Sequence, residues 1–268
     1  TKMKIKNIRR KEINYKNYVK RRASTDDCLN AVTEPCKIFD EKGELVCIYG
    51  MLNSDTTELV EELKNVNYQT TTRTGGLLTT SRIFGFQPRL ERRQRSFCNQ
   101  TSLNKEHPKT EAILRGLASS ISEQYFAQAP EVYENHKEMF SEVLEEWKIQ
   151  DSLFTSGIIN KNNPLNYHFD SGNFENVLSC MLVLRKNMEG GWLCVPEIDT
   201  RFLLKNNSLF MFDGQKLLHG VSPMSEMETE DDAYRFSIVY YSLKGMWKCL
   251  TLTEELLRSR KLELEKLK

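Results

Sequence analysis

Two histidines and one aspartate have the residue types and the spacing of an iron site. His168 and Asp170 are two residues apart, and His219 follows later in the chain. Two imidazoles and one carboxylate are the ligand set of the facial triad that binds non-haem Fe(II) and leaves coordination positions open. The pattern therefore predicts that these three side chains form a catalytic metal centre.

A second polar pair lies 16 residues beyond His219, where Arg235 and Ser237 alternate with Phe236 and Ile238. On an extended strand this alternation gives one polar and one apolar face. A guanidinium beside a hydroxyl suits a carboxylate, because arginine can hold both carboxylate oxygens in parallel hydrogen bonds. We expect Arg235 and Ser237 to hold the far carboxylate of 2-oxoglutarate, used together with Fe(II) and O₂. The alternative is a surface ion pair of Arg235 at the rim of a barrel.

The elements that must position these residues are short strands. His168 and Asp170 would project to the same face of an extended strand, and Gly172 allows the chain to turn away. In a jelly roll, strands distant in sequence lie side by side, which would bring His219 to the first pair. Between Leu153 and Trp247, turn signals separate six β-rich runs without a helical pattern: Phe154–Ile159, Val177–Leu184, Trp192–Val195, Phe202–Leu204, Leu209–Phe212 and Arg235–Ser242.

Helical patterns precede and follow this region. Apolar stripes predict a helix after Ser54 or Asp55, a helix over Lys109–Phe126 and another beginning at Pro130. Residues 67–105 are expected to be loops with short strands, and 251–268 a terminal helix that begins with a capping box. The fold class is therefore mainly β with flanking helices (α+β), a double-stranded β-helix (jelly roll) core with an N-terminal helical layer.

The predicted organisation is a basic N-terminal arm over 1–25, one oxygenase domain over 26–250 and a C-terminal helix over 251–268. Within the domain, residues 26–150 form the helical and loop-rich part and 151–250 the jelly-roll core. His136 lies beside the apolar stripe of a helix, where we expect a histidine at the edge of the core rather than a metal ligand.

Charge is distributed unevenly although the 268 residues carry a formal net charge of only +1. Residues 1–22 contain ten lysines or arginines and one acidic residue, Glu12. A second basic stretch, with only Glu91 as an acid, contains Arg73, Arg82, Arg89, Arg92, Arg93 and Arg95. Such segregation is typical of a basic docking face, although a solvated arm would give the same pattern.

Cysteine usage and hydropathy bear on the compartment. The seven cysteines include no Cys-x-x-Cys pair, so neither a disulfide framework nor a zinc finger is predicted. No apolar run approaches the ~20 residues that span a bilayer. We therefore expect an intracellular protein, nuclear or cytoplasmic, with viral origin compatible and no membrane partner. The sequence does not determine the oligomeric state, and a monomer is favoured.

Several segments together resemble the TET/J-binding-protein family of 2-oxoglutarate oxygenases. The resemblance extends from Arg73 to Ser242 and is strongest from Phe154 onward. Upstream, Ser81–Phe86 and Arg95–Cys98 also resemble the family. The core segments are Phe154–Asn160, His168–Asn173, Glu189-Gly190-Gly191, Phe212-Asp213-Gly214 and His219-Gly220-Val221.

This resemblance implies hydroxylation of the 5-methyl group of a pyrimidine, thymine or 5-methylcytosine, in nucleic acid. It assigns the iron ligands to His168, Asp170 and His219, and the 2-oxoglutarate arginine to Arg235. Asn160 matches a polar position that would contact cosubstrate or substrate, and Arg82 matches a position on the substrate side. The sequence lacks the cysteine-rich zinc region of animal members, which puts sequence-selective targeting in doubt.

An enzyme that reaches a base methyl inside a DNA duplex must flip the nucleotide into a pocket. The basic arm and the arginine-rich stretch would neutralise phosphates. Phe84 and Phe86 flank Gly85 and would stack on a base, or else simply pack in the interior. The alternatives are a prolyl- or lysyl-type protein hydroxylase, a small-molecule oxygenase, or a non-catalytic nucleic-acid-binding jelly roll.

Overall fold

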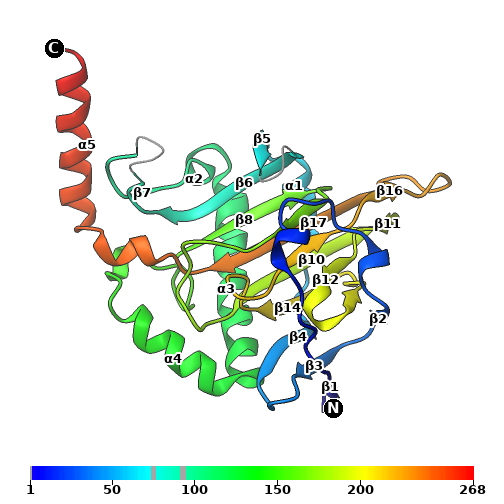
Figure 1. The fold of residues 1–268 in the computed structure, drawn as a ribbon. Coiled ribbons are helices and arrows are strands. Elements are labelled where there is room, and N and C mark those ends of the chain that lie inside the picture. Colours follow the sequence, from blue (N-terminus) through cyan, green and yellow to red (C-terminus); the bar gives the residue numbers. More distant parts are fainter. Residues whose placement is uncertain (1, 74–76, 91–94) are drawn as a thin grey trace. The chain divides into compact units, whose positions relative to one another are not determined.

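Strands dominate the part of the chain that carries the predicted site, and they form two large sheets. The computed structural model describes residues 2–73, 77–90 and 95–268 (Figure 1). The main sheet has the strand order β1-β3-β4-β14-β10-β17-β8-β6-β5, and the minor sheet the order β2-β13-β12-β15-β9. This architecture confirms the predicted double-stranded β-helix.

Most strands of the main sheet are antiparallel, and two of its central strands are largely apolar. The central strands β10 (Ser179–Lys186) and β14 (Ser208–Phe212) pair in antiparallel register, and every residue of β14 is buried. The other members are β1 (Lys4–Asn7), β3 (Cys36–Phe39), β4 (Leu45–Met51), β5 (Gln69–Arg73), β6 (Leu77–Gln87), β8 (Ser156–Lys161) and β17 (Tyr234–Tyr241), with β7 (Asn99–Gln100) paired to β6.

The minor sheet is built from short strands, and a separate two-stranded ribbon accompanies it. The ribbon pairs β11 (Met188–Gly190) with β16 (Met224–Glu226). The minor-sheet strands are β2 (Asn30–Val32), β9 (Leu165–His168), β12 (Leu193–Val195), β13 (Thr200–Phe202) and β15 (His219–Val221).

The core of the β-helix lies between these two sheets. Tyr49 and Phe210 from the main sheet belong to one apolar cluster with Leu193, Phe202 and Val221 from the minor sheet. Burial of each such side chain stabilises the fold by roughly 1.5–3 kcal/mol. Because this cluster closes the two sheets on each other, the strand ends that carry the polar site residues are held in fixed positions.

The chain divides into two compact units, and each draws segments from both sides of residue 150. The first comprises residues 1–82, 158–171 and 178–239. It contains the minor sheet, most of the main sheet and α1 (Thr57–Lys64). The second comprises residues 83–157, 172–177 and 240–268. The chain passes between the units within β6, β8 and β17.

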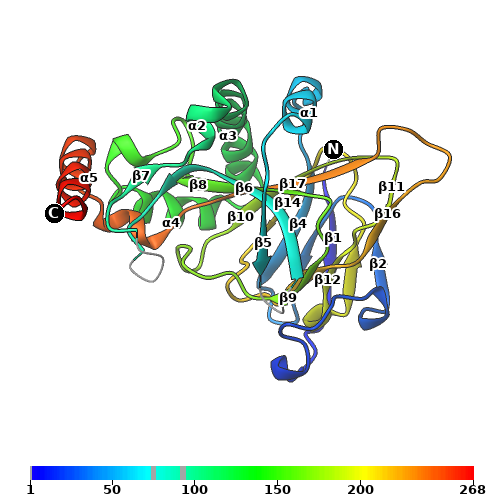
Figure 2. The same ribbon diagram turned by 90° about the horizontal axis from the view of Figure 1, so that it is seen from above.

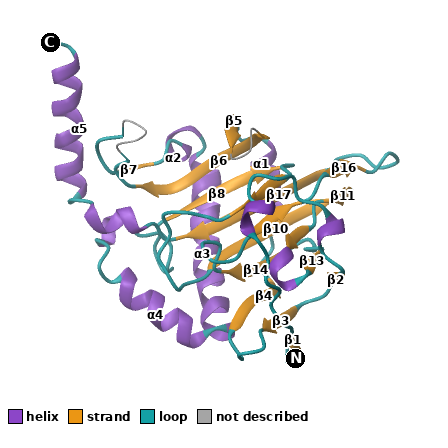
Figure 3. Ribbon diagram, viewed as in Figure 1, coloured by secondary structure: helices purple, strands orange, loops and turns teal. Residues whose placement is uncertain are grey.

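The second unit carries four of the helices that are drawn in purple in Figure 3. They are α2 (Leu103–Glu106), α3 (Pro108–Gln128), α4 (Pro130–Phe140) and α5 (Leu252–Lys266). Prolines at the first positions of α3 and α4 and a Thr251 side chain that accepts from the Glu254 N–H confirm the predicted starts. No helix within the described ranges is long and apolar enough to cross a membrane.

Three local expectations differ from the structure. Residues 67–105 include an 11-residue strand, β6, paired with β5, because threonines along both strands favour β-structure where polarity suggested loops. The basic N-terminal segment is not a free arm. It contributes β1, which pairs in parallel with β3, and Arg10 forms an ion pair with Asp40 at 2.9 Å.

The third difference is a disulfide between Cys98 and Cys249 in the second unit, where none was predicted. The two cysteines are 151 residues apart, so no local spacing signals the pairing. The other five cysteines are free and buried. The β13 strand also begins two residues before the predicted run at Phe202.

Candidate metal centre

The structure brings His168, Asp170 and His219 together, although 51 residues separate the two histidines. His168 ends β9 and His219 begins β15, and these antiparallel strands place the two residues directly opposite each other. Their ring centroids are 4.5 Å apart. One potential ligand atom from each of the three residues lies within 4.8 Å of the other two. This is the spacing that a single ion requires.

The two imidazoles are oriented alike. The Nδ1 atoms of His168 and His219 lie 2.7 Å from the carbonyl oxygens of Asn166 and Leu217, respectively. A carbonyl only accepts, so each Nδ1 carries the proton and each Nε2 keeps its lone pair. The Nε2 atoms lie 3.3 Å and 3.5 Å from one Asp170 carboxylate oxygen, Oδ1. Backbone carbonyls that fix the tautomer in this way are typical outer-shell partners of metal-bound histidines.

Asp170 is held by a turn that requires glycine. Its backbone N–H donates to the Gly214 carbonyl at 2.9 Å, and a Cβ on Gly214 would lie 2.0 Å from its Oδ2 atom. Partial burial opposes ionisation of Asp170, but the nearby His219 and His168 lower its pKa well below the usual range. The same contacts raise the pKa of His219 against the effect of burial. The three groups thus form an electrostatically coupled cluster suited to a divalent cation.

Arg235 is the second unusual feature of the site. Its side chain is 1% exposed, and its Nε and Nη2 atoms have no hydrogen-bond partner among the described residues. Burial, assisted by the charge of Arg185, lowers its pKa to about 9, so the guanidinium remains cationic at neutral pH. An unpaired buried charge is costly. The arrangement therefore fits an anionic group that these orphan N–H donors would bind.

Arg235 extends from β17 in the main sheet toward the start of the minor-sheet strand β12. A Cβ on Gly191, two residues before β12, would lie 2.9 Å from the Arg235 Cδ and Nε atoms, so only glycine leaves room for the side chain. Since β12 also pairs with β15, the same strand adjoins both His219 and the end of Arg235. Ser237, two residues along β17, is 3% exposed and shares the face of Arg235.

Arg185 near the end of β10 was not predicted from the sequence. Its Nη2 atom donates to the carbonyls of Met188 and Gly190, whereas its Nη1 atom is buried without a partner among the described residues. It is also the charge that lowers the pKa of Arg235. Two guanidiniums thus approach each other with orphan donors. An arginine directly after the apolar run Met181–Leu184 was the only available signal.

The structure places the other predicted residues away from exposed surface. Asn160 on β8 is 4% exposed, and its side-chain oxygen accepts from Asn163 at 3.4 Å. Arg82 is buried and donates to the Asn67 carbonyl at 2.7 Å. Its guanidinium is thus already engaged within the first unit.

Phe84 and Phe86 lie in the interior of the second unit. Phe84 packs edge-on against Tyr240, and Phe86 against Trp147. Phe84 is fully buried and Phe86 8% exposed, because the strand inserts both rings into the core. In this structure neither ring offers a face on which a base could stack, which corrects the expected base-stacking role.

The arginines of the arginine-rich stretch whose side chains the structure describes have partners inside the protein. Arg89 donates to Glu255 at 2.9 Å and to the Lys248 carbonyl, and Arg95 donates to Gln87. Arg92 and Arg93 lie outside the described residues, as does the side chain of Arg73. The arginines that the structure describes therefore do not form the expected open docking face.

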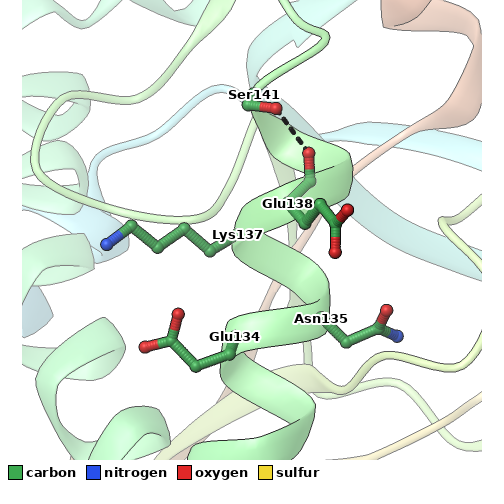
Figure 4. Close-up of a pocket in the computed structure, with 5 residues that line it drawn as sticks. All are labelled: Glu134, Asn135, Lys137, Glu138 and Ser141. Carbon is green, nitrogen blue, oxygen red and sulfur yellow. Dashed lines mark hydrogen bonds between the residues drawn. The ribbon is translucent and has the colours of Figure 1, made fainter.

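His136 and a hollow along α4 are two further polar features of the second unit. His136 is fully buried between Tyr125 and Ser242, as expected for a core histidine. The hollow, of about 590 Å³, is open and is lined by residues of α4 and the residue that follows it: Glu134, Asn135, Lys137, Glu138 and Ser141 (Figure 4). Neither brings together a set of metal ligands.

Comparison with known proteins places the chain in one class, the oxygenases of the 2OGFeDO superfamily. The Tet_JBP model, described as the oxygenase domain of that superfamily, matches residues 83–244, which is more than half of the chain. The chain therefore belongs to the Tet_JBP family.

Two relatives are trypanosomatid proteins named bifunctional helicase and thymine dioxygenase JBP2. The Leishmania tarentolae protein is 24% identical over 256 residues, which cover 91% of this chain and 22% of the relative. The Trypanosoma brucei brucei protein is 28% identical over 145 residues, covering 54% of this chain and 13% of the relative. The chain thus spans about a fifth of the length of the first relative.

Among solved structures, NgTET1 in complex with 5mC DNA is similar to this chain. The TM-score is 0.59, the sequence identity 16%, and the alignment covers 87% of each chain. This likeness establishes the fold.

Proposed function

We propose that this chain is an Fe(II)- and 2-oxoglutarate-dependent dioxygenase that hydroxylates the 5-methyl group of a pyrimidine, thymine or 5-methylcytosine, in DNA. The observation that carries the proposal is the pairing of a convergent His/Asp/His cluster with a buried, unpaired arginine on the fold of the Tet_JBP family. Residues 26–250 would act as one oxygenase domain, since the family match lies within that range.

His168, Asp170 and His219 would hold Fe(II). Their Nε2 lone pairs and the Asp170 carboxylate converge, and three ligands on one face leave positions for the cosubstrate and O₂. Bound Fe(II) supplies the O₂ chemistry that converts 2-oxoglutarate, O₂ and the substrate methyl into succinate, CO₂ and a hydroxymethyl group.

Arg235 would anchor the far carboxylate of 2-oxoglutarate, assisted by Ser237 and by the nearby charge of Arg185. The anion would satisfy the orphan Nε and Nη2 donors, and its negative charge would offset the repulsion between the two guanidiniums. Asn160, buried on the strand that neighbours β17, would contribute a polar contact to the cosubstrate or substrate.

The DNA substrate is supported by the family and by the names of its relatives, a thymine dioxygenase and a TET protein bound to 5mC DNA. A base methyl within a duplex is inaccessible to a partly buried metal centre. The target nucleotide would therefore be flipped out of the stack and held beside the cluster.

Nucleoside mass spectrometry tests this proposal. The protein is incubated with Fe(II), 2-oxoglutarate and ascorbate on duplex DNA that contains thymine and 5-methylcytosine, with Asp170→Ala as the control. A hydroxymethyl nucleoside that only the wild type produces supports the proposal and identifies the base. If succinate formed at the same rate with and without DNA and every nucleoside stayed unmodified, DNA would be rejected as the substrate.

A further inference from the structure

The N-terminal strap, defined here as residues 15–23, covers the free edge of β9. Strand β9 is the last strand of the minor sheet and ends at His168. The Lys20 N–H donates to the Tyr167 carbonyl and the Tyr167 N–H donates to the Arg21 carbonyl, both at 2.9 Å. The strap therefore extends the edge of the sheet one residue away from a proposed iron ligand, as the blue segment beside β9 in Figure 2 shows.

One side of the strap is anchored by apolar packing. Tyr18, Val19 and Ala23 join a cluster with Tyr167 and Leu218, the residue before His219. A second contact pairs the rings of Tyr15 and Phe169 at 5.1 Å. Phe169 lies between His168 and Asp170 in the sequence. The strap is thus fixed against the residues adjacent to all three proposed iron ligands.

The strap also carries exposed basic side chains. Lys16, Lys20 and Arg22 are exposed and form no ion pair with a described residue, whereas Arg21 is paired with Asp27 at 2.8 Å. Residues 15–23 contain no acidic side chain. Three cations without an ion pair to a described residue therefore lie on a segment whose backbone is hydrogen-bonded to Tyr167, the residue before His168.

We propose that Lys16, Lys20 and Arg22 bind the phosphates that flank the target nucleotide. This inference rests on the proposed DNA substrate and assigns its docking to the strap rather than to the arginine-rich stretch. Arg82 and Arg89 already have internal partners, so they offer less to phosphates. A nucleotide flipped toward the metal leaves its own backbone at the mouth of the site, which is where fixed cations are effective.

The test is the affinity for a 5-methylcytosine-containing duplex, measured across a range of salt concentrations with the triple variant Lys16→Ala, Lys20→Ala and Arg22→Ala. Loss of three phosphate contacts should weaken binding about 10–100-fold near 0.1 M salt. It should also make the slope of log affinity against log salt shallower by about 2–3.

A matched control removes three exposed lysines elsewhere in the first unit, Lys4, Lys6 and Lys42. Lys4 and Lys6 lie on β1, at the opposite edge of the main sheet from β5. This control should bind within about 3-fold of wild type, and the charge-preserving Lys16→Arg, Lys20→Arg, Arg22→Lys variant should keep the affinity and the slope. Retention of charge in this last variant also separates phosphate binding from damage to the strap.

Two outcomes would overturn the inference. Wild-type affinity in the triple alanine variant would exclude the strap, and equal weakening in the Lys4/Lys6/Lys42 control would reduce the effect to net charge. Failure of the proposed function has a different signature, because wild-type protein would then form no hydroxymethyl nucleoside. A wild type that modifies DNA beside a strap variant with unchanged affinity would reject the strap alone.

Discussion

Two histidine environments in this chain differ in what their ring nitrogens have left to bind. In the second unit, His136 is fully buried, with Nδ1 3.2 Å from the Tyr125 hydroxyl and Nε2 2.9 Å from the Ser242 hydroxyl. Since Ser242 donates its proton to the Leu153 carbonyl, His136 donates through Nε2 and accepts through Nδ1. Both nitrogens are satisfied, so this histidine has a structural role.

His168 and His219 in the first unit have the opposite arrangement. Each ring donates its Nδ1 proton to a backbone carbonyl, and its Nε2 lone pair points toward Asp170. The arginines show the same contrast, because Arg82 has a carbonyl partner whereas Arg235 has orphan donors. Buried polar groups are normally hydrogen-bonded. Buried donors and acceptors that lack a partner therefore distinguish a binding site from polar side chains that only stabilise the fold.

Removal of a proposed iron ligand should have the largest effect. Asp170→Ala deletes the only carboxylate of the cluster and should lower Fe(II) affinity and succinate formation by more than about 100-fold, the upper end of the effect of losing an outer-shell partner. Equilibrium dialysis with Fe(II) and a succinate assay measure the two quantities. Asp170→Ala protein that retains turnover would remove this residue from the metal centre.

Arg235→Gln comes next, because it removes the charge that would bind the cosubstrate and keeps a polar side chain of similar length. We expect the KM for 2-oxoglutarate to rise about 100-fold, as expected when a charge-assisted bidentate contact worth about 3 kcal/mol is lost. Arg235→Lys should be intermediate, since it keeps the charge but not the planar fork. An unchanged KM in both variants would place the anchor elsewhere.

Arg185→Gln should have a smaller effect on the same quantity. Part of the Arg185 guanidinium is already used by the Met188 and Gly190 carbonyls, so it contributes chiefly through its charge. We expect the KM for 2-oxoglutarate to rise roughly 3–10-fold, in line with a net contribution of about 1 kcal/mol. A KM that falls would instead mean that the two guanidiniums repel each other even with the cosubstrate bound.

His136→Phe should change stability and leave chemistry nearly intact. It removes the hydrogen bonds that His136 forms with the Tyr125 and Ser242 hydroxyls, and it should cost about 1–3 kcal/mol of unfolding free energy, with an unchanged KM for 2-oxoglutarate. Burial lowers the pKa of His136 from 6.5 to about 3.

The lowered pKa of His136 predicts a pH dependence that denaturant unfolding can measure. Above pH 6.5 the histidine is neutral in both states and its contribution to stability is complete. As the pH falls from 6.5 toward 3, His136 is protonated in the unfolded state but stays neutral in the folded state. The contribution of His136 to the free energy of unfolding is therefore lost. The variant should lack this component, and an acid-induced loss identical to that of wild type would assign the effect to other groups.

Much of the site could be predicted because its residues lie close to strand ends with strong local patterns. The structure contains three local patterns that the sequence predicted: the His168/Asp170 spacing, the buried run before His219 and the alternation around Arg235. The role of Arg185 could not be predicted in this way, because it depends on β10 and β17, which are adjacent only in the folded sheet. The roles of Gly191 and Gly214 likewise depend on side chains from distant segments.

In the fold, too, elements with a local sequence pattern could be predicted, and elements that depend on distant partners could not. The largely apolar runs Val177–Leu184 and Leu209–Phe212 were recognisable, as were helices that begin at proline. The edge strand β1 pairs with residues 32 positions away, and the Cys98–Cys249 disulfide joins residues 151 positions apart; no local period encodes either pairing. Phe84 and Phe86 were misjudged for this reason, because their burial depends on Tyr240 and Trp147.

The most direct test of the central claim is calorimetric binding of 2-oxoglutarate to wild-type, Asp170→Ala and Arg235→Gln proteins, without oxygen and with or without Fe(II). We predict tight binding only to the wild type with Fe(II), and weakened binding when the metal, Asp170 or Arg235 is removed. Binding of equal affinity under all these conditions would contradict the account, because the convergent cluster and the unpaired arginine would then not form the cosubstrate site.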